Sequence, residues 1–201
     1  MRRWCFSLLL AFPLVAWADA PTMTRILMEV PAPAGFDFCW GGTCAGVLRV
    51  SLDEMEWMRV RMLFDPVPED AEAERETISR AIGLLESMVG PKTGTAGDRA
   101  GTFGNSAYPG QLDCNDEATN TTSYLRMMVD DGLIRFHRVQ DTATRGRFLF
   151  FGRHSSAVMV ESASGRKFVV DSWFYDNGKP AVVLPLDVWR GGWKPADTQA
   201  H

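Results

Sequence analysis

The segment Asp113-Cys114-Asn115-Asp116-Glu117-Ala118 places a cysteine at the point where a helix is expected to begin. Aspartate is a favoured N-cap residue, and apolar side chains recur at helical spacing after it up to about Asp131, where Gly132 is the expected cap. The backbone N–H groups in the first turn of a helix are unpaired, and the positive end of the helix dipole favours an anion. The sequence therefore predicts a helix over 114–131 whose first turn stabilises a thiolate or an oxyanion.

Residues 1–20 have the features of a signal peptide. A short positive region at the N-terminus precedes an apolar stretch, 4–17, and Ala18-Asp19-Ala20 supplies the small residues of a cleavage site. The apolar stretch is shorter than the ~20 residues that span a bilayer, and an uncleaved anchor is the alternative interpretation. We expect an exported protein, periplasmic or secreted, whose mature chain has no membrane span.

The composition of the chain is that of an ordinary globular protein. Hydrophobic residues make up 46% and charged residues 23% of the sequence, and the net charge is −4. After the signal peptide about 180 residues remain, which suits one domain, 21–201. Because the chain has no basic field, we expect neither nucleic acid nor anionic lipid as a partner.

Three cysteines follow the signal peptide, and two of them are close enough in sequence to pair. Cys39 and Cys44 flank Trp40-Gly41-Gly42-Thr43, in which Gly-Gly supplies the positive backbone dihedrals of a tight turn. We expect a disulfide that fixes a local hairpin and contributes on the order of 2 kcal/mol. A redox pair or half of a metal site is the rival interpretation, although the spacing differs from C-x-x-C. Cys114 is then the odd thiol, which a nucleophile would explain.

Helices are expected in the first half of the chain. Ser51 with Glu54 has the form of a capping box, and Met55, Met58 and Leu63 would lie on the apolar side of the helix that follows. A clearer helix is expected over 71–89, where apolar residues recur at three- and four-residue spacing and Gly90 is placed to end it.

Strands are expected in the second half, over 133–139, 147–151, 155–161 and 167–174. Helices followed by strands are typical of an α+β fold with an antiparallel sheet.

A base for the thiol has to come from His137 or His154, since the remaining histidine ends a polar tail. The negative charges of Asp116 and Glu117 oppose a thiolate at Cys114. Activation should therefore depend on the imidazole.

His154 is favoured because it leads into the strand over 155–161, while the strand over 167–174 carries Asp171 in an apolar run. An acid in such surroundings is costly unless something pairs with it. If a two-residue turn joins the strands, Asp171 lies opposite Ser156, and it shares a face of the sheet with His154 on a diagonal. The carboxylate would then fix the tautomer of the imidazole, whose other nitrogen faces the thiol.

Three segments together resemble the transglutaminase-like superfamily of papain-like enzymes, which includes the bacterial transglutaminase-like cysteine proteinases. They lie within 111–175 and read Asp113-Cys114-Asn115-Asp116-Glu117-Ala118, His154-Ser155-Ser156-Ala157-Val158-Met159-Val160-Glu161 and Val169-Val170-Asp171-Ser172-Trp173. The shared features are a Cys that opens a helix, a His that begins one strand and an Asp on the next. The resemblance implies a papain/transglutaminase-like fold, with a central helix packed on an antiparallel sheet. It also implies that Cys114, His154 and Asp171 form a triad that acts by acyl transfer.

The chain departs from this family at two points. Papain-like enzymes often place a Gln or another donor before the Cys to complete the oxyanion hole, and Gln111 is near, although its spacing is closer than in papain. Some relatives bind calcium through acids near the active site, and calcium is one interpretation of Asp113, Asp116 and Glu117 here. Helix capping is the favoured interpretation of these acids. We therefore expect no cofactor or metal, with calcium as the alternative.

Two features near the triad have both a functional and an ordinary interpretation. Residues 94–110, rich in Gly, Thr, Ser and Asn, lead towards Cys114 and form either a lid or a surface crossover. Trp173, Trp189 and Trp193 either line a substrate groove or pack in the core.

The expected function is that of an exported thiol acyl-transfer enzyme, a cysteine peptidase or amidase acting on a peptide, protein or cell-wall amide. With an amine as acceptor, the same triad would serve a transglutaminase-type acyltransferase. The third alternative is a catalytically inactive envelope domain, in which Cys114 is buried and inert.

Overall fold

Helices precede the main sheet along the chain, as the sequence predicts. The structure is a computed structural model, and it describes residues 20–102, 109–146 and 152–196. Its first half contains α1 (Ala20–Met28), β1 (Phe36–Trp40), β2 (Gly46–Val50), α2 (Glu54–Leu63), α3 (Ala71–Thr93) and α4 (Cys114–Asp130). Its second half contains β3 (His137–Arg145), β4 (His154–Glu161), β5 (Lys167–Asp171), β6 (Val182–Pro185) and α5 (Leu186–Arg190). The predicted α+β class is confirmed: the helices pack against a C-terminal four-stranded antiparallel sheet.

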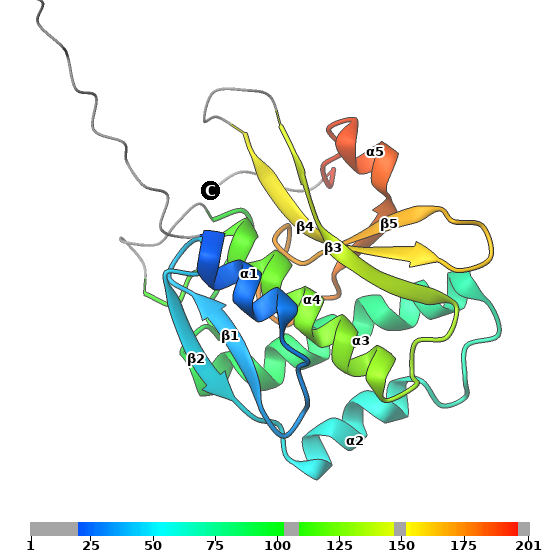
Figure 1. The fold of residues 1–201 in the computed structure, drawn as a ribbon, viewed down its shortest axis with the longest axis horizontal. Coiled ribbons are helices and arrows are strands. Elements are labelled where there is room, and N and C mark those ends of the chain that lie inside the picture. The colour runs from blue at the N-terminus through cyan, green and yellow to red at the C-terminus, as the bar shows by residue number, and fades with distance from the viewer. Residues whose placement is uncertain (1–19, 103–108, 147–151, 197–201) are drawn as a thin grey trace, which may run out of the picture.

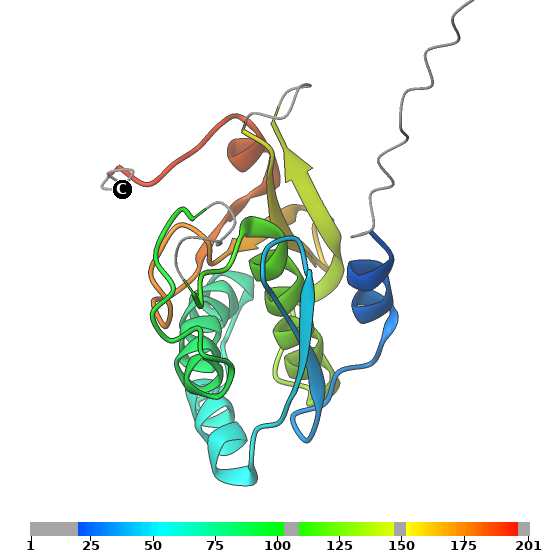
Figure 2. The ribbon, with the colours of Figure 1, turned by 90° about the vertical axis from the view of Figure 1, so that its left-hand side faces the viewer.

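Helix α4 occupies the centre of the molecule. It contacts β3, β4 and β5 of the sheet, the β1–β2 hairpin, α1 and α3 (Figures 1 and 2). The predicted N-cap is confirmed, because the Asp113 carboxylate accepts hydrogen bonds from the N–H groups of Asn115 and Asp116. The helix ends at Asp130, and Gly132 follows with φ 71°. A helix covered on so many sides has to bury its polar first half as well as its apolar second half.

The main sheet has the strand order β3-β4-β5-β6, and every pairing is antiparallel. Ala157 pairs with Val170 and Val160 with Lys167, which is the predicted register of β4 against β5. Apolar side chains of α3, α4 and β4 form the core beneath the sheet, and four that are fully buried are Ile78, Leu85, Leu125 and Met159. Each such side chain contributes roughly 1.5–3 kcal/mol to the stability of the fold.

The predictions for α2 are wrong in two respects. Its capping box pairs Asp53 with Glu56, two residues later than the predicted Ser51–Glu54 pair. Met55 and Met58, predicted to be on the apolar side, are 75% and 40% exposed, while only Leu63 packs against the core. The buried face instead presents three side chains at helical spacing, Trp57, Val60 and Phe64. Burying indole and phenyl rings removes more apolar surface from water than burying methionines.

Helix α3 continues past Gly90, which was predicted to end it. The helix ends at Thr93, and Gly94 caps it in the left-handed region with φ 79°. Gly90 is required for close packing: a Cβ at this position would lie 2.9 Å from the Cα of Ala96. The glycine therefore lets the following loop return against the helix.

Two predicted strands have different limits in the structure. The strand predicted over 133–139 begins at His137 and runs to Arg145, because the Glu74 carboxylate accepts the N–H groups of Arg135 and Phe136 and holds them outside the sheet. The strand predicted over 167–174 ends at Asp171, and the chain then turns towards α4.

Several predictions fall on residues that the structure does not describe. They are the strand over 147–151, part of the loop over 94–110, and the signal peptide apart from Ala20. Among the described residues, no helix is both long enough and apolar enough to cross a membrane.

Candidate active site

The structure brings together the ends of three elements. Cys114 is the first residue of α4, His154 begins β4 and Asp171 ends β5. Nε2 of His154 lies 2.6 Å from Oδ2 of Asp171, and both residues are buried. Because a carboxylate only accepts hydrogen bonds, Nε2 is the donor in this contact, and in the corresponding tautomer of the imidazole Nδ1 carries the lone pair.

The Cys114 thiol lies against the start of the same strand. It donates to the carbonyl of Arg153 across 4.0 Å, and Sγ accepts the backbone N–H of Ser155. These two residues flank His154, whose buried Nδ1 has no hydrogen-bond partner among the described residues. The thiol and the imidazole therefore lie at the same strand end, but no hydrogen bond joins Sγ of Cys114 to Nδ1 of His154.

The surroundings of Cys114 favour the neutral thiol. Burial, together with the negative charges of Asp113 and Asp171, raises its pKa, the Ser155 N–H lowers it, and the resulting pKa is about 11. The sequence reasoning expected the opposing charges to come from Asp116 and Glu117. Both are themselves buried, and burial raises the pKa of Asp116 to about 7 and that of Glu117 well above its ordinary value. A neutral thiol needs a base that takes its proton during the reaction.

Trp189, for which the sequence left groove lining and core packing open, contacts Asp171, and the sequence did not predict this contact. Its indole N–H donates to Oδ2 of Asp171 at 2.7 Å, and the side chain is fully buried. Trp173 and Phe174 complete an aromatic wall around His154, with ring centroids 4.5 and 5.1 Å from the imidazole. Of the two earlier interpretations, core packing describes Trp189, but the contact with Asp171 adds a polar role. No local sequence motif predicts that contact, because Trp189 lies on α5, which is separated from Asp171 by a loop and by β6.

Arg145, at the end of β3, packs against the rings of Trp189 and Phe174. Its guanidinium lies 4.6 Å from the centroid of the Trp189 ring and donates to the carbonyl groups of Trp189 and Trp193. Burial lowers the pKa of Arg145, while the charge of Asp171 raises it. A guanidinium stays protonated, so it adds a positive charge near the Asp171 carboxylate.

The β1–β2 hairpin covers the first turn of α4. Cys39 and Cys44 are at disulfide distance, with Cα atoms 4.7 Å apart, as predicted. The N–H groups of Gly42 and Cys44 donate to the Asp116 carboxylate at 2.8 and 2.6 Å, and Thr43 donates its N–H and hydroxyl to Asp113. The closed loop thus binds the two acids that cap the helix.

These contacts bear on the alternative of a calcium site. Asp113 and Asp116 direct their oxygens at backbone N–H groups, whereas Glu117 accepts from the hydroxyl of Ser172. Within the described ranges, these three acids do not form a group whose oxygens converge on one point. Helix capping is the role that the geometry gives to Asp113 and Asp116.

The remaining candidates lie in other contacts. The amide of Gln111, the expected oxyanion donor, gives its N–H to the carbonyl of Gly97 and accepts the N–H of Arg99, so it braces a loop. His137, the other candidate base, is buried with Nδ1 2.7 Å from Oε1 of Glu74. Of these two histidines, His154 is the one beside the strand end that contacts the Cys114 thiol.

No family model, no curated protein and no solved structure matches this chain. Its function has to be inferred from the chemistry of these residues.

Proposed function

We propose that the protein is an exported thiol acyl-transfer enzyme with a papain/transglutaminase-like fold, in which Cys114 is the nucleophile. His154 is the general base and acid, and Asp171 holds its ring. One observation carries the proposal: His154 is fixed by Asp171 through Nε2, while its unpaired Nδ1 is buried beside the strand end that contacts the thiol. A buried basic nitrogen without a partner is costly in a purely structural role.

The proposed reaction has two halves. As Sγ of Cys114 attacks the carbonyl carbon of an amide, Nδ1 of His154 takes the thiol proton and Asp171 stabilises the imidazolium. The tetrahedral intermediate collapses when the imidazolium gives its proton to the leaving amine, and a thioester remains on Cys114. Water, or a second amine, then attacks the thioester while Nδ1 takes its proton. The thiol leaves with that proton, and the free enzyme is restored.

Backbone N–H groups supply only part of an oxyanion site. The N–H groups of Asn115 and Asp116 donate to the Asp113 side chain, and that of Glu117 donates to the Asp113 carbonyl. The N–H of Cys114, which contacts the Sγ atom of the same residue, is the remaining backbone donor in this turn. It is the donor that we assign to the oxyanion.

We favour hydrolysis, which makes the protein a cysteine peptidase or amidase. An exported protein meets peptides and cell-wall amides, and water is the most abundant acceptor. An amine acceptor would make the same site a transglutaminase-type acyltransferase. The competing proposal is a catalytically inactive envelope domain, and a specific observation favours it: the thiol is buried and its pKa is raised to about 11.

Alkylation kinetics separate the enzyme from the inactive domain. The mature protein and His154→Ala are treated with iodoacetamide from pH 4 to 9, and the modified cysteine is located by mass spectrometry. If the protein is an enzyme, iodoacetamide should label Cys114 near neutral pH, and His154→Ala should lower the labelling rate at least about tenfold. His137→Ala is the matched control, because it removes a buried imidazole outside the site.

Equal rates in the wild type and His154→Ala, or labelling only after unfolding in urea, would support the inactive domain. If Cys114 is activated, release of amines from peptides and incorporation of a fluorescent primary amine distinguish hydrolysis from transfer.

A further inference from the structure

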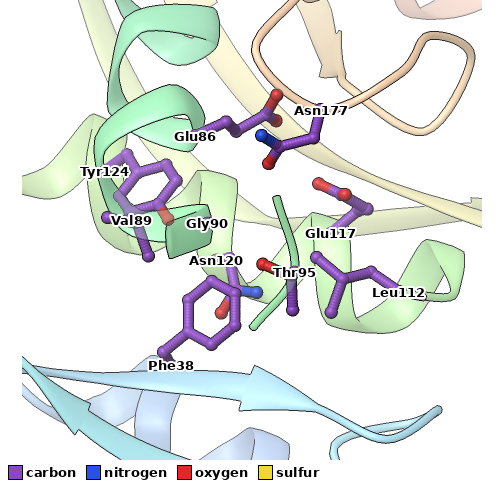
Figure 3. A pocket seen from close by; sticks show the side chains of 10 residues that line it. All are labelled: Phe38, Glu86, Val89, Gly90, Thr95, Leu112, Glu117, Asn120, Tyr124 and Asn177. Carbon is purple, nitrogen blue, oxygen red and sulfur yellow. The ribbon is translucent and has the colours of Figure 1, made fainter. Parts of the chain in front are cut away.

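A small cavity lies between α3, α4, the strand β1, which contributes Phe38, and two loops (Figure 3). Its volume is about 10 Å³, which is roughly the space that a cavity needs to hold one water molecule. The polar side chains in its wall include Glu86 from α3, Glu117, Asn120 and Tyr124 from α4, and Asn177. None of these residues belongs to the proposed triad.

Two polar atoms in this wall lack partners. Oε1 of Glu86 and the hydroxyl of Tyr124 are buried without a hydrogen bond to any described residue. The other carboxylate oxygen of Glu86 accepts the N–H of Gly178 at 3.1 Å, so this side chain is fixed in place. A buried hydroxyl and a buried carboxylate each need a partner, and a cavity of this size beside them suits a water molecule.

The wall also carries an excess of acid. Glu117 is buried and accepts the Ser172 hydroxyl at 2.5 Å, and its carboxyl group is paired with that of Asp98. The titratable groups that face these acids are Glu86 from α3, Tyr124 from α4, and Asp176, which acts on Asp98. Among the described residues no lysine, arginine or histidine forms an ion pair with Glu86, Asp98 or Glu117. Two carboxyl groups form a hydrogen bond only when one of them holds a proton.

We propose that this cavity binds one water molecule, which accepts from the Tyr124 hydroxyl and donates to Oε1 of Glu86, and that Glu117 keeps a proton which it donates to Asp98. Burial favours the neutral form of Glu117, because its pKa lies well above the ordinary value. The site is independent of any catalytic activity.

The position of the site gives it a role in holding the triad segments. Asp98 accepts the N–H of Leu112 at 2.8 Å, two residues before Cys114, and Ser172 directly follows Asp171. Loss of the proton from Glu117 would place two carboxylates in contact and weaken both attachments. The hydrogen bonds of Asp98 and Glu117 therefore hold the segment before Cys114 and the residue after Asp171.

Two measurements test the proposal. A crystal structure of the mature protein should show one water between the Tyr124 hydroxyl and Glu86, and Tyr124→Phe should lose this water together with a few degrees of melting temperature. An empty cavity in the wild type, with an unchanged melting temperature in Tyr124→Phe, would overturn the water site.

The proposed proton on Glu117 is tested by measuring the melting temperature as a function of pH. An acid whose folded pKa is raised stabilises the fold below its unfolded pKa, and this stability is lost as the pH rises through the folded value. The wild type should therefore lose on the order of 5 °C more than Glu117→Gln between pH 5 and pH 9, because the amide imitates the protonated acid. Glu76→Gln, on the exposed side of α3, is the matched control and should follow the wild type.

Two outcomes would contradict a proton on Glu117. One is the same dependence of the melting temperature on pH in Glu117→Gln and the wild type. The other is stabilisation by calcium or sodium chloride that Glu117→Gln abolishes, which would show a cation in its place. If Glu117→Gln does not fold, Glu86→Gln removes the neighbouring charge and should flatten the same slope.

Discussion

Trp189 and His154 bind the same oxygen of Asp171. The indole N–H of Trp189 lies 2.7 Å from Oδ2, and Nε2 of His154 lies 2.6 Å from it. A carboxylate oxygen that accepts two hydrogen bonds is held firmly in position. Trp189 therefore determines how firmly the imidazole is oriented, although we assign it no contact with a substrate.

Removing the indole N–H should weaken this orientation. Trp189→Phe keeps an aromatic ring but leaves Asp171 with one hydrogen bond fewer, which we expect to cost about 1–3 kcal/mol in the free energy of unfolding. The alkylation rate of Cys114 near neutral pH should fall at the same time, because the ring of His154 is less well held. Urea denaturation and iodoacetamide kinetics measure the two effects.

Trp193→Phe is the control for this variant, since the Trp193 ring packs on Phe174. A Trp189→Phe protein with the wild-type alkylation rate would show that the indole serves packing alone.

Asp171→Asn should give the imidazole the wrong tautomer. The amide can donate its N–H to Nε2, which leaves the proton on Nδ1 and removes the base from the thiol. If Cys114 depends on His154, turnover or alkylation near neutral pH should fall by about 10²- to 10⁴-fold. Asp187→Asn, at an exposed position in α5, should have no effect. A loss that equals the loss of folded protein, measured by circular dichroism, would instead indicate a structural role for Asp171.

The buried thiol should lower stability at alkaline pH. The folded pKa of Cys114 is raised to about 11 by burial, whereas an unfolded thiol has a pKa of about 8.5. Because the folded value is the higher one, the contribution is complete below about pH 8 and is lost as the pH rises towards 11. At pH 10 the wild type should have lost about 2 kcal/mol more than Cys114→Ser in the free energy of unfolding. Parallel pH profiles of the two proteins would show that the thiol ionises in the folded state as easily as in water.

Local signals in the sequence predicted the parts of the fold that local chemistry determines. Asp113 was predicted as the cap of α4 because its side chain competes for N–H groups within its own turn. The register of β4 and β5 follows from a short turn, in which Gly165 adopts φ 73°. From that register alone His154 and Asp171 fall on one face of the sheet, so their pairing was predictable.

Features that depend on distant packing were not predictable in this way. Helix α2 has two apolar stripes, and only the arrangement of the core selects the one with Trp57 over the one with Met55. The interruption before β3 comes from Glu74, which lies more than 60 residues earlier in the chain than Arg135 and Phe136. The depth of burial of Cys114, which raises its pKa, likewise results from elements that meet only in the folded protein.

Opening the Cys39–Cys44 pair should loosen the start of α4. The loop between these cysteines gives the N–H groups of Gly42, Thr43 and Cys44 to the acids that cap the helix. Removing the cross-link increases the freedom of the unfolded chain and of this loop, so the Cys39→Ser/Cys44→Ser variant should lose on the order of 2 kcal/mol in the free energy of unfolding. Its Cys114 should also react faster with iodoacetamide, because a mobile loop exposes the first turn of the helix. Dithiothreitol should reproduce both effects in the wild type and change nothing in the variant. A variant with wild-type stability and an unchanged reaction rate at Cys114 would show that the hydrogen bonds to Asp113 and Asp116 hold the loop without the cross-link.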